Sequence, residues 1–466
     1  MSWQIAHLRI NDAATGRPTP VRLRLTDAQG APLAPLGRLS QLPSRSEPAP
    51  GHLWLEGGLW HYIDGACEVR LPAGPLHLAY TKGPDYLPGQ VTLERRVGQM
   101  ALRCEIQPRR QPRQQGWYGG DCFVEQLSPA AAGLEAAAEG LDFVHLAASS
   151  ETELLEFSAQ EPAWSRDGTL VAVGTWNGRQ SSPSLLLMHT HRVVFPLRQT
   201  DPGFEHYTLA DWAHQAHRKR GFVVWPFHPP DAETLATLLH GEIDALGLLP
   251  GVDFEAALHW AYRLWNAGLP IRLAAGSGKR DVSRPVGLWR TWVKLPEGIP
   301  FTLPAWIEAL RQGGGTISRG PWLSLEVNGP GRGTVKNHEA GPEGTLFAVA
   351  SAVGLQTGDR LELVADGQVV ASAEASVDQA VLTCELKGQA VRWLAARCRD
   401  QKGGWLAHTS PLATANHQTS KTLIVSAMQE LRSELATLAK DLPVDHATRL
   451  QPLIQEVLAA KPEVSP

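Results

Sequence analysis

The segment GWYGGDCFVEQ, residues 116–126, carries side chains spaced for metal chemistry. Asp121, Phe123 and Glu125 occupy every second position of a short predicted strand, just after a Gly-Gly turn. Side chains two residues apart on a strand point to the same face. Carboxylates or imidazoles on such a face can hold a divalent metal, whose bound water becomes a nucleophile near neutral pH. Phe123 cannot ligate a metal, so this segment offers the carboxylates of Asp121 and Glu125 alone.

Three other segments carry residues that could complete such a site or bind another group. His189 and His191 form an HxH pair at the end of a predicted strand, and His228 follows a different predicted strand. Lys279 and Arg280 follow the Gly-rich turn of AAGSGKR, whose main-chain N–H groups could cradle an anion. That turn matches neither a P-loop nor a dinucleotide-binding fingerprint, so it does not indicate a nucleotide.

Two different patterns precede this segment. Residues 1–106 alternate apolar and polar side chains, as in VRLRLTDAQG, and turn residues separate the runs. This alternation predicts a β-sandwich. Residues 107–115, QPRRQPRQQ, carry only proline, arginine and glutamine and predict a linker with a solvated surface.

The remainder of the chain divides into three parts. Over residues 116–327 strand patterns alternate with helix patterns, and Thr208 and Asp253 are typical N-cap residues. Such alternation predicts a parallel-stranded α/β domain, plausibly a barrel. Residues 328–412 return to a β pattern and predict a second sandwich. Residues 413–466 carry two apolar helical stripes, which we expect to dock on the body of the protein, with pairing in a homodimer as the alternative.

Composition excludes several classes of protein. With 466 residues the chain needs more than one core, and 43 Lys and Arg against 47 Asp and Glu give a net charge of −4. We therefore expect no nucleic-acid partner. The five cysteines form no CxxC pair, which indicates neither a zinc knuckle nor a disulfide framework. The sequence shows no long apolar run and no secretory signal, so we expect a cytoplasmic protein without a membrane partner.

With these elements in order, the chain resembles the CehA/McbA family of metallohydrolases. This family belongs to the PHP (polymerase and histidinol phosphatase) superfamily of metal-dependent phosphoesterases and hydrolases. The resemblance covers most of residues 1–412, and the first part resembles a transthyretin-like or carboxypeptidase-regulatory β-module. It rests on the segments GWYGGDCFVEQLSP, GLDFVHLAA, GFVVWPFHPP, WAYRLWNAGLPIRLAAGSGKRDVSRPVGLWRTWVK and ISRGPWLSLEVNGPGRG. It implies a multidomain protein of mixed α/β and all-β class. A PHP-like distorted β/α barrel would be flanked by N-terminal and C-terminal β-sandwiches and followed by a helical tail.

The same resemblance implies where metal ligands should stand, and most of them are replaced. Asp121 matches the family's D-x-H-x-H strand end, whereas Phe123 and Glu125 stand at its two histidine positions. Trp225 stands at the histidine of a V-H-P-F strand end, and Arg280 at the aspartate of a G-T-D turn. A guanidinium is permanently charged and repels a metal at close range. An ion pair between Arg280 and Asp121 would mark a lost metal centre.

These residues lead to one expectation and two alternatives. We expect a protein without metal or hydrolase activity, whose pocket binds a small anionic ligand or a protein. The candidate pocket residues are Asp121, Phe123, Glu125, Trp225, His228, Lys279 and Arg280. In the first alternative, Asp121 and Glu125 join His189 and His191, or His228, around zinc or manganese in an active phosphoesterase or esterase. In the second, the β-modules bind glycans or proteins. No cofactor is expected unless the first alternative holds.

Overall fold

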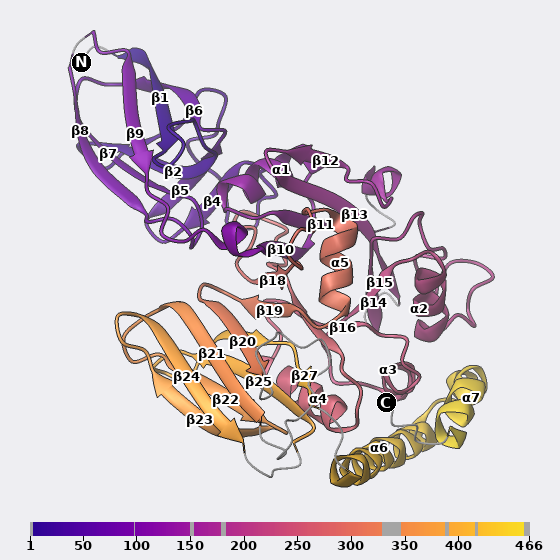
Figure 1. Cartoon of the computed structure of the whole chain (residues 1–466). Helices are drawn as coiled ribbons and strands as arrows, with labels where there is room; N and C mark the ends of the chain where they lie inside the picture. Colours follow the sequence, from indigo (N-terminus) through magenta and orange to yellow (C-terminus); the bar gives the residue numbers. More distant parts are fainter. Residues whose placement is uncertain are drawn as a thin grey trace.

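The computed structural model describes residues 3–96, 98–149, 153–178, 183–328, 346–386, 391–414 and 418–460. Its N-terminal module, within residues 3–106, is a pair of sheets that enclose one core (Figure 1). One sheet has the order β6-β1-β9 and the other β4-β5-β2-β7-β8, with β3 beside β2. Alternate side chains of β1, among them Leu8 and Ile10, are buried between the sheets, as the alternating pattern predicts. The strands are β1 (Gln4–Asp12), β2 (Val21–Asp27), β3 (Pro32–Leu33), β4 (His52–Leu55), β5 (Gly58–Ile63), β6 (Ala66–Leu71), β7 (Gly74–Thr81), β8 (Gly89–Arg95) and β9 (Ala101–Ile106).

The middle of the chain is built on seven neighbouring strands in the order β17-β16-β15-β14-β13-β11-β10. Each of them contributes to one apolar cluster, against which Trp306 of α5 (Leu303–Arg311) also packs. The strands are β10 (Trp117–Val124), β11 (Phe143–Ala148), β13 (Thr169–Gly178), β14 (Ser184–Met188), β15 (Phe222–Pro226), β16 (Ala245–Leu248) and β17 (Arg272–Ala275). The helices outside them are α1 (Pro129–Ala138), α2 (Leu209–Arg218), α3 (Ala232–Leu239) and α4 (Phe254–Asn266). Shorter elements are η1 (Pro112–Gln115), η2 (Glu153–Phe157) and β12 (Trp164–Arg166), which pairs with β13.

The prediction of parallel strands holds for part of this sheet. β10, β11 and β13 are parallel, and so are β15, β16 and β17. β14 is antiparallel to both β13 and β15, so the prediction is wrong for this strand. The reason is the short stretch between Gly178 and Ser184, because a parallel connection needs a crossover of a dozen or more residues.

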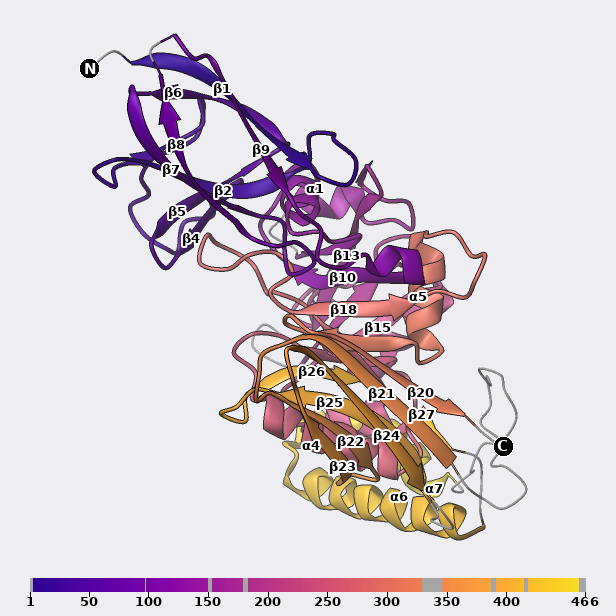
Figure 2. The same ribbon diagram turned by 60° about the vertical axis from the view of Figure 1, so that its left-hand side comes forward.

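The same sheet continues without a break into the C-terminal strands. β18 (Arg290–Lys294) pairs with β10, β19 (Gly315–Ser318) with β18, and β26 (Trp405–Thr409) with β19. β25, β22 and β23 then extend the sheet, and β20-β21-β24 form the facing sheet of a sandwich (Figure 2). A domain boundary at residue 327 would cut through β20, which pairs with β21 along its length. The strands are β20 (Trp322–Asn328), β21 (Leu346–Leu355), β22 (Arg360–Ala365), β23 (Gln368–Glu374), β24 (Asp378–Leu386), β25 (Trp393–Arg399) and β27 (Leu412–Ala413).

Two C-terminal helices, α6 (Gln418–Leu438) and α7 (Val444–Ala459), pack on the body of the protein (Figure 1). The short η3 (Ala439–Asp441) joins them. Leu435, Leu450 and Ile454 are buried against α3, as expected for docking. Arg449 adds a buried ion pair of 2.8 Å with Glu233 of α3. No helix of the described residues is long and apolar enough to cross a membrane.

The His217 ring, in the last turn of α2, forms hydrogen bonds with two carboxylates that precede β16, and one of these carboxylates also binds the start of β15. Its ring nitrogens lie 2.8 Å from a Glu242 oxygen and 2.9 Å from an Asp244 oxygen, and the Asp244 carboxylate also accepts the Val223 N–H. Two carboxylate partners require a ring that donates at both nitrogens, which is the protonated form. Burial lowers the pKa of His217, but the hydrogen bonds and charges of Asp244 and Glu242 outweigh it and raise the pKa to about 9.

This arrangement predicts how stability depends on pH. Because folding raises the pKa of His217 from about 6.5, its contribution is fully present below about pH 6.5 and is lost as the pH rises through about 9. We expect His217→Gln to lower the free energy of unfolding more at about pH 6 than at about pH 10, measured by urea unfolding. His214→Gln, at an exposed neighbouring ring, is the control and should show a smaller effect at both values. An equal effect of His217→Gln at the two pH values would contradict this account.

Candidate functional site

Asp121 lies near the end of β10, and its buried carboxylate accepts three main-chain hydrogen bonds. One oxygen accepts the N–H groups of Phe123 at 3.0 Å and Ser277 at 2.9 Å. The other accepts the N–H of Gly287 at 2.7 Å. Burial raises the pKa of Asp121 to about 6, although the hydrogen bonds from Ser277, Gly287 and Phe123 oppose the rise. The carboxylate thus joins β10 to both ends of the segment between Ser277 and Gly287.

That segment also closes the ring of strands. The Gly278 N–H donates to the Phe123 carbonyl at 2.9 Å, and the Glu125 N–H donates to the Lys279 carbonyl at 2.7 Å. Val124 and Lys279 form a parallel bridge. The chain beyond β17 therefore pairs with the end of β10, and the seven strands become a closed barrel. Gly276 permits the approach, because a Cβ atom there would lie 2.5 Å from the Phe123 nitrogen and 2.7 Å from an Asp121 oxygen.

The Gly-rich turn does not leave its N–H groups open to an anion. The Ser277 N–H donates to Asp121, the Gly278 N–H to Phe123, and the Lys279 N–H to the Ser277 hydroxyl at 3.2 Å. Three consecutive donors are thus used inside the protein. The anion cradle expected from AAGSGKR is not formed by these three groups.

Phe123 fills the barrel interior near Asp121. Its side chain is 3% exposed and packs on Trp176 of β13, with 5.0 Å between the ring centroids. Cys122 and Phe123 both belong to the interior cluster because the pairing of β10 with β11 shifts register between Asp121 and Val124. The position that would carry a metal ligand on this strand is therefore occupied by apolar packing.

Two ion pairs surround this strand end, one exposed and one buried. Arg280 pairs with Glu125 at 2.7 Å, and the arginine side chain is 62% exposed. Arg280 does not pair with Asp121, whose partners are main-chain N–H groups. Lys279 is 2% exposed, and its ammonium lies 3.2 Å from Glu135 of α1 and 3.0 Å from the Arg284 carbonyl. Both cations expected to attract an anion thus already have carboxylate partners.

Glu135 extends these contacts to the N-terminal module. Its second oxygen accepts the Gly51 N–H at 2.9 Å. Burial raises the pKa of Glu135, and the Lys279 charge opposes the rise. Sequence reasoning missed Glu135, because nothing in the Ala-rich pattern PAAAGLEAAAEG distinguishes a buried carboxylate from a solvated one.

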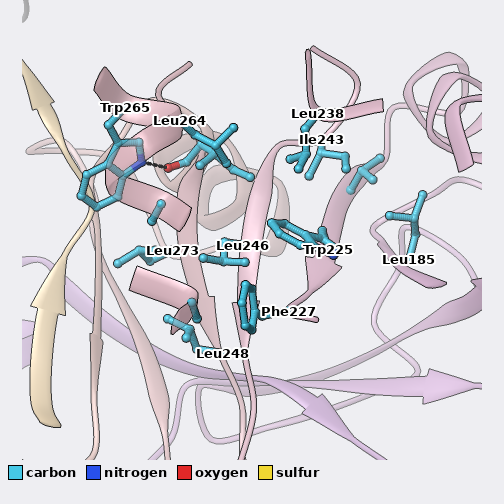
Figure 3. Close-up of a cluster of buried hydrophobic side chains, with 14 of the residues drawn as sticks. Leu185, Trp225, Phe227, Leu238, Ile243, Leu246, Leu248, Leu264, Trp265 and Leu273 are labelled. Atoms are coloured by element: carbon cyan, nitrogen blue, oxygen red, sulfur yellow. Dashed lines mark hydrogen bonds between the residues drawn. The ribbon is translucent and has the colours of Figure 1, made fainter. Parts of the chain in front are cut away.

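Trp225, a candidate pocket residue, does not line the barrel interior as Phe123 does. Its neighbours Phe222 and Val224 belong to the interior cluster, whereas Trp225 belongs to the cluster between the strands and the outer helices. Figure 3 shows its ring among Leu185, Leu238 and Ile243. The physical reason is strand alternation, because a position one residue from an inward side chain faces outward.

The three remaining histidine candidates do not gather at Asp121. His189 and His191 follow β14, whose last residue Met188 pairs with Phe222, the first residue of β15. They therefore lie where β15 begins. Because β15 runs in the same direction as β10, this is the end of the barrel opposite to the C-terminal end of β10. His191 contacts the Lys219 carbonyl there at 3.1 Å. His228 follows the finish of β15, contacts the Pro229 carbonyl at 3.1 Å and packs its ring on Trp225.

Within the described ranges, no three His, Cys, Asp or Glu side chains are arranged to hold a metal ion. The geometry around Asp121 is that of a structural closure, with each polar group bound to another part of the protein. The last residues of the motif ISRGPWLSLEVNGPGRG lie outside the described residues.

Comparison with known proteins finds distant structural similarity. No protein-family model matches the chain, and no curated protein matches it. A solved structure of the lesion-specific endonuclease PfuEndoQ from Pyrococcus furiosus is similar over 43% of this chain, with 15% identity and a TM-score of 0.30. The chain spans 58% of the length of that protein.

The closure predicts the effect of an isosteric change at Asp121. In Asp121→Asn the amide N–H₂ must face one of the three N–H donors, so at least one buried hydrogen bond is lost. We expect a loss of about 1–3 kcal/mol in the free energy of unfolding, measured with denaturant, and unchanged metal content. Asp281→Asn, in the same loop but at its surface, is the control and should cost less than about 0.5 kcal/mol. Unchanged stability together with lost metal would instead indicate a ligand.

The buried pair predicts a second pattern. Lys279→Met leaves the Glu135 carboxylate buried without its cation, which costs about 3–5 kcal/mol. Adding Glu135→Gln removes the buried carboxylate charge that has lost its cation, and the amide oxygen still accepts the Gly51 N–H. The double variant should therefore regain much of the lost free energy of unfolding. Arg280→Gln breaks the exposed pair and should cost less than about 1 kcal/mol. Chemical denaturation of the wild type, Lys279→Met, Glu135→Gln and the double variant measures the cycle, and additive losses would show that Lys279 and Glu135 do not interact.

Proposed function

We propose that this chain is a CehA/McbA-like member of the PHP superfamily that acts as a binding protein and not as a metallohydrolase. In this proposal the barrel serves as a scaffold that holds the N-terminal module and the C-terminal strands. The function then lies in binding a small ligand or a partner.

The carrying observation is the set of three N–H donors around the Asp121 carboxylate. Asp121 is the one residue of the D-x-H-x-H pattern that this chain keeps. A carboxylate that closes the barrel through both oxygens is committed to main-chain donors. The apolar ring of Phe123 beside it supports the same conclusion, because it excludes water from the position where a metal-bound nucleophile would form.

A rearranged metal site that used His189 or His191 would need ligands from both ends of the barrel, and His228 instead packs its ring on Trp225 of the outer cluster. Asp121 and Glu125 lie at one end, and His189 and His191 at the other. One ion with ligands at about 2.0–2.2 Å cannot join groups separated in this way. The geometry therefore favours binding over metal-assisted hydrolysis.

The proposal predicts a protein purified without stoichiometric metal. We expect elemental mass spectrometry to find substoichiometric zinc and manganese, and excess chelator to leave the unfolding temperature unchanged, because a metal bound to the native state would raise it. A panel of phosphoesters and carboxylic esters should show no turnover that depends on added zinc or manganese. One equivalent of metal that survives dialysis, or metal-dependent turnover lost in Asp121→Asn, would overturn the proposal.

A further inference from the structure

A cleft of about 690 Å³ lies between the N-terminal module, the segment 107–115 and the barrel. Small-molecule sites typically have volumes of about 300–1,000 Å³ and often form where domains meet. The cleft lies away from Asp121, beside the residues that precede β11 and begin β13, among them Asp142 and Thr169. None of the residues in the expected pocket around Asp121 lines it.

The carboxylates that line the cleft already have partners. Asp12 accepts the Tyr86 hydroxyl at 2.7 Å and the N–H groups of Ala14 and Thr15. The other pairs are Asp85 with Arg110 at 2.8 Å, Asp64 with Arg166 at 2.6 Å, and Asp142 with Arg113 and the Gly119 N–H. Asp167 lies 3.3 Å from Arg166. Most of these carboxylates therefore point to partners within the wall, and Asp12 is held by neutral donors alone.

Lys82 and Arg17 form no direct ion pair with a carboxylate in the described ranges, although the charges of Asp12, Glu139 and Asp64 act on Lys82 from nearby. Lys82 is 8% exposed, and its ammonium donates to the Pro20 carbonyl at 3.1 Å and the Ala137 carbonyl at 2.6 Å. An ammonium has three donors, so one remains for a ligand. Burial, followed by the Arg113 charge, lowers the pKa of Lys82 to about 8. Arg17 is exposed at the rim, and no ion pair within the described part of the chain involves it.

The rest of the lining combines rings with a few Thr and Gln side chains. Pro18, Pro20, Pro108 and Pro112 line the cleft and have no N–H donor, and the Tyr86 ring lies beside the Lys82 ammonium at 5.7 Å. A ring-shaped body can pack on such rings. There it would lie close to Lys82 and Arg17.

We propose that this cleft binds a small organic anion, a carboxylate or a phosphate monoester on a ring-shaped body, with Lys82 and Arg17 as its charge partners. The inference rests on the proposed binding function and names its site. Lys82 also caps α1 by binding the Ala137 carbonyl in the last turn of that helix, and this structural role does not use its third donor.

The test is calorimetric titration of the full chain with phenyl phosphate and with benzoate, at fixed ionic strength and in the presence of chelator. We expect saturable binding of at least one anion at a single site, and no binding of benzylamine. Arg17→Gln should weaken the affinity about tenfold, the effect of losing about 1.4 kcal/mol. Lys82→Met, which keeps an aliphatic stem, should weaken it further. Arg103→Gln, an exposed cation of the same module outside the cleft, is the control and should bind as the wild type does.

The outcomes separate the two proposals. Tighter phenyl phosphate binding assigns a phosphate ligand, and tighter benzoate binding assigns a carboxylate. Absence of binding at millimolar anion, or equal affinity of wild type and Arg17→Gln, would overturn the cleft proposal. Because Arg17 is exposed, its variant decides the matter even if Lys82→Met fails to fold. Tightly bound metal in the purified protein would overturn the metal-free function and leave the titration result standing.

Discussion

The barrel depends on one buried carboxylate that binds the main chain on two sides of a gap. The seven strands alone form an open sheet, because β17 and β10 stand at its two ends and do not pair with each other. Asp121 bridges the gap by binding Ser277 and Gly287. The isolated bridge between Val124 and Lys279, with its two main-chain hydrogen bonds, lies beside it. Burying a carboxylate is costly, and the three N–H donors offset that cost. The same hydrogen bonds occupy both oxygens of the Asp121 carboxylate.

The closure segment also fixes the N-terminal module. Lys279 reaches Glu135, and Glu135 reaches Gly51. Glu139 follows Glu135 by four residues and is the C-cap of α1 (Pro129–Ala138). Its carboxylate binds Arg22 at 2.6 Å and the Tyr62 hydroxyl at 2.8 Å. Two acidic residues one helical turn apart thus dock the module through buried contacts. The cleft lies beside these contacts, where Ala137 of α1 lines it.

Much of this architecture follows from local sequence signals, and the exceptions have physical causes. Alternation in VRLRLTDAQG and the N-caps Thr208 and Asp253 place strands and helices where the structure has them. The short stretch between Gly178 and Ser184 already favours an antiparallel β14, so the sequence contains the signal for this exception. The outward face of Trp225, in contrast, depends on packing against distant helices. The partner of Arg280 depends on the register of a loop against β10. A shift of one residue exchanges the two faces of a strand, and no local pattern fixes that register at a strand end.

The pairing of β19 with β26 has a consequence for synthesis of the chain. About ninety residues separate Ser318 from Ala407, and the edge of β19 stays open until they have left the ribosome. An unpaired edge strand is a template for pairing with another chain. The C-terminal strand β26 therefore covers this edge only after it has emerged, and from then on it protects the barrel against aggregation. A chain that ends after residue 327 would present this edge permanently.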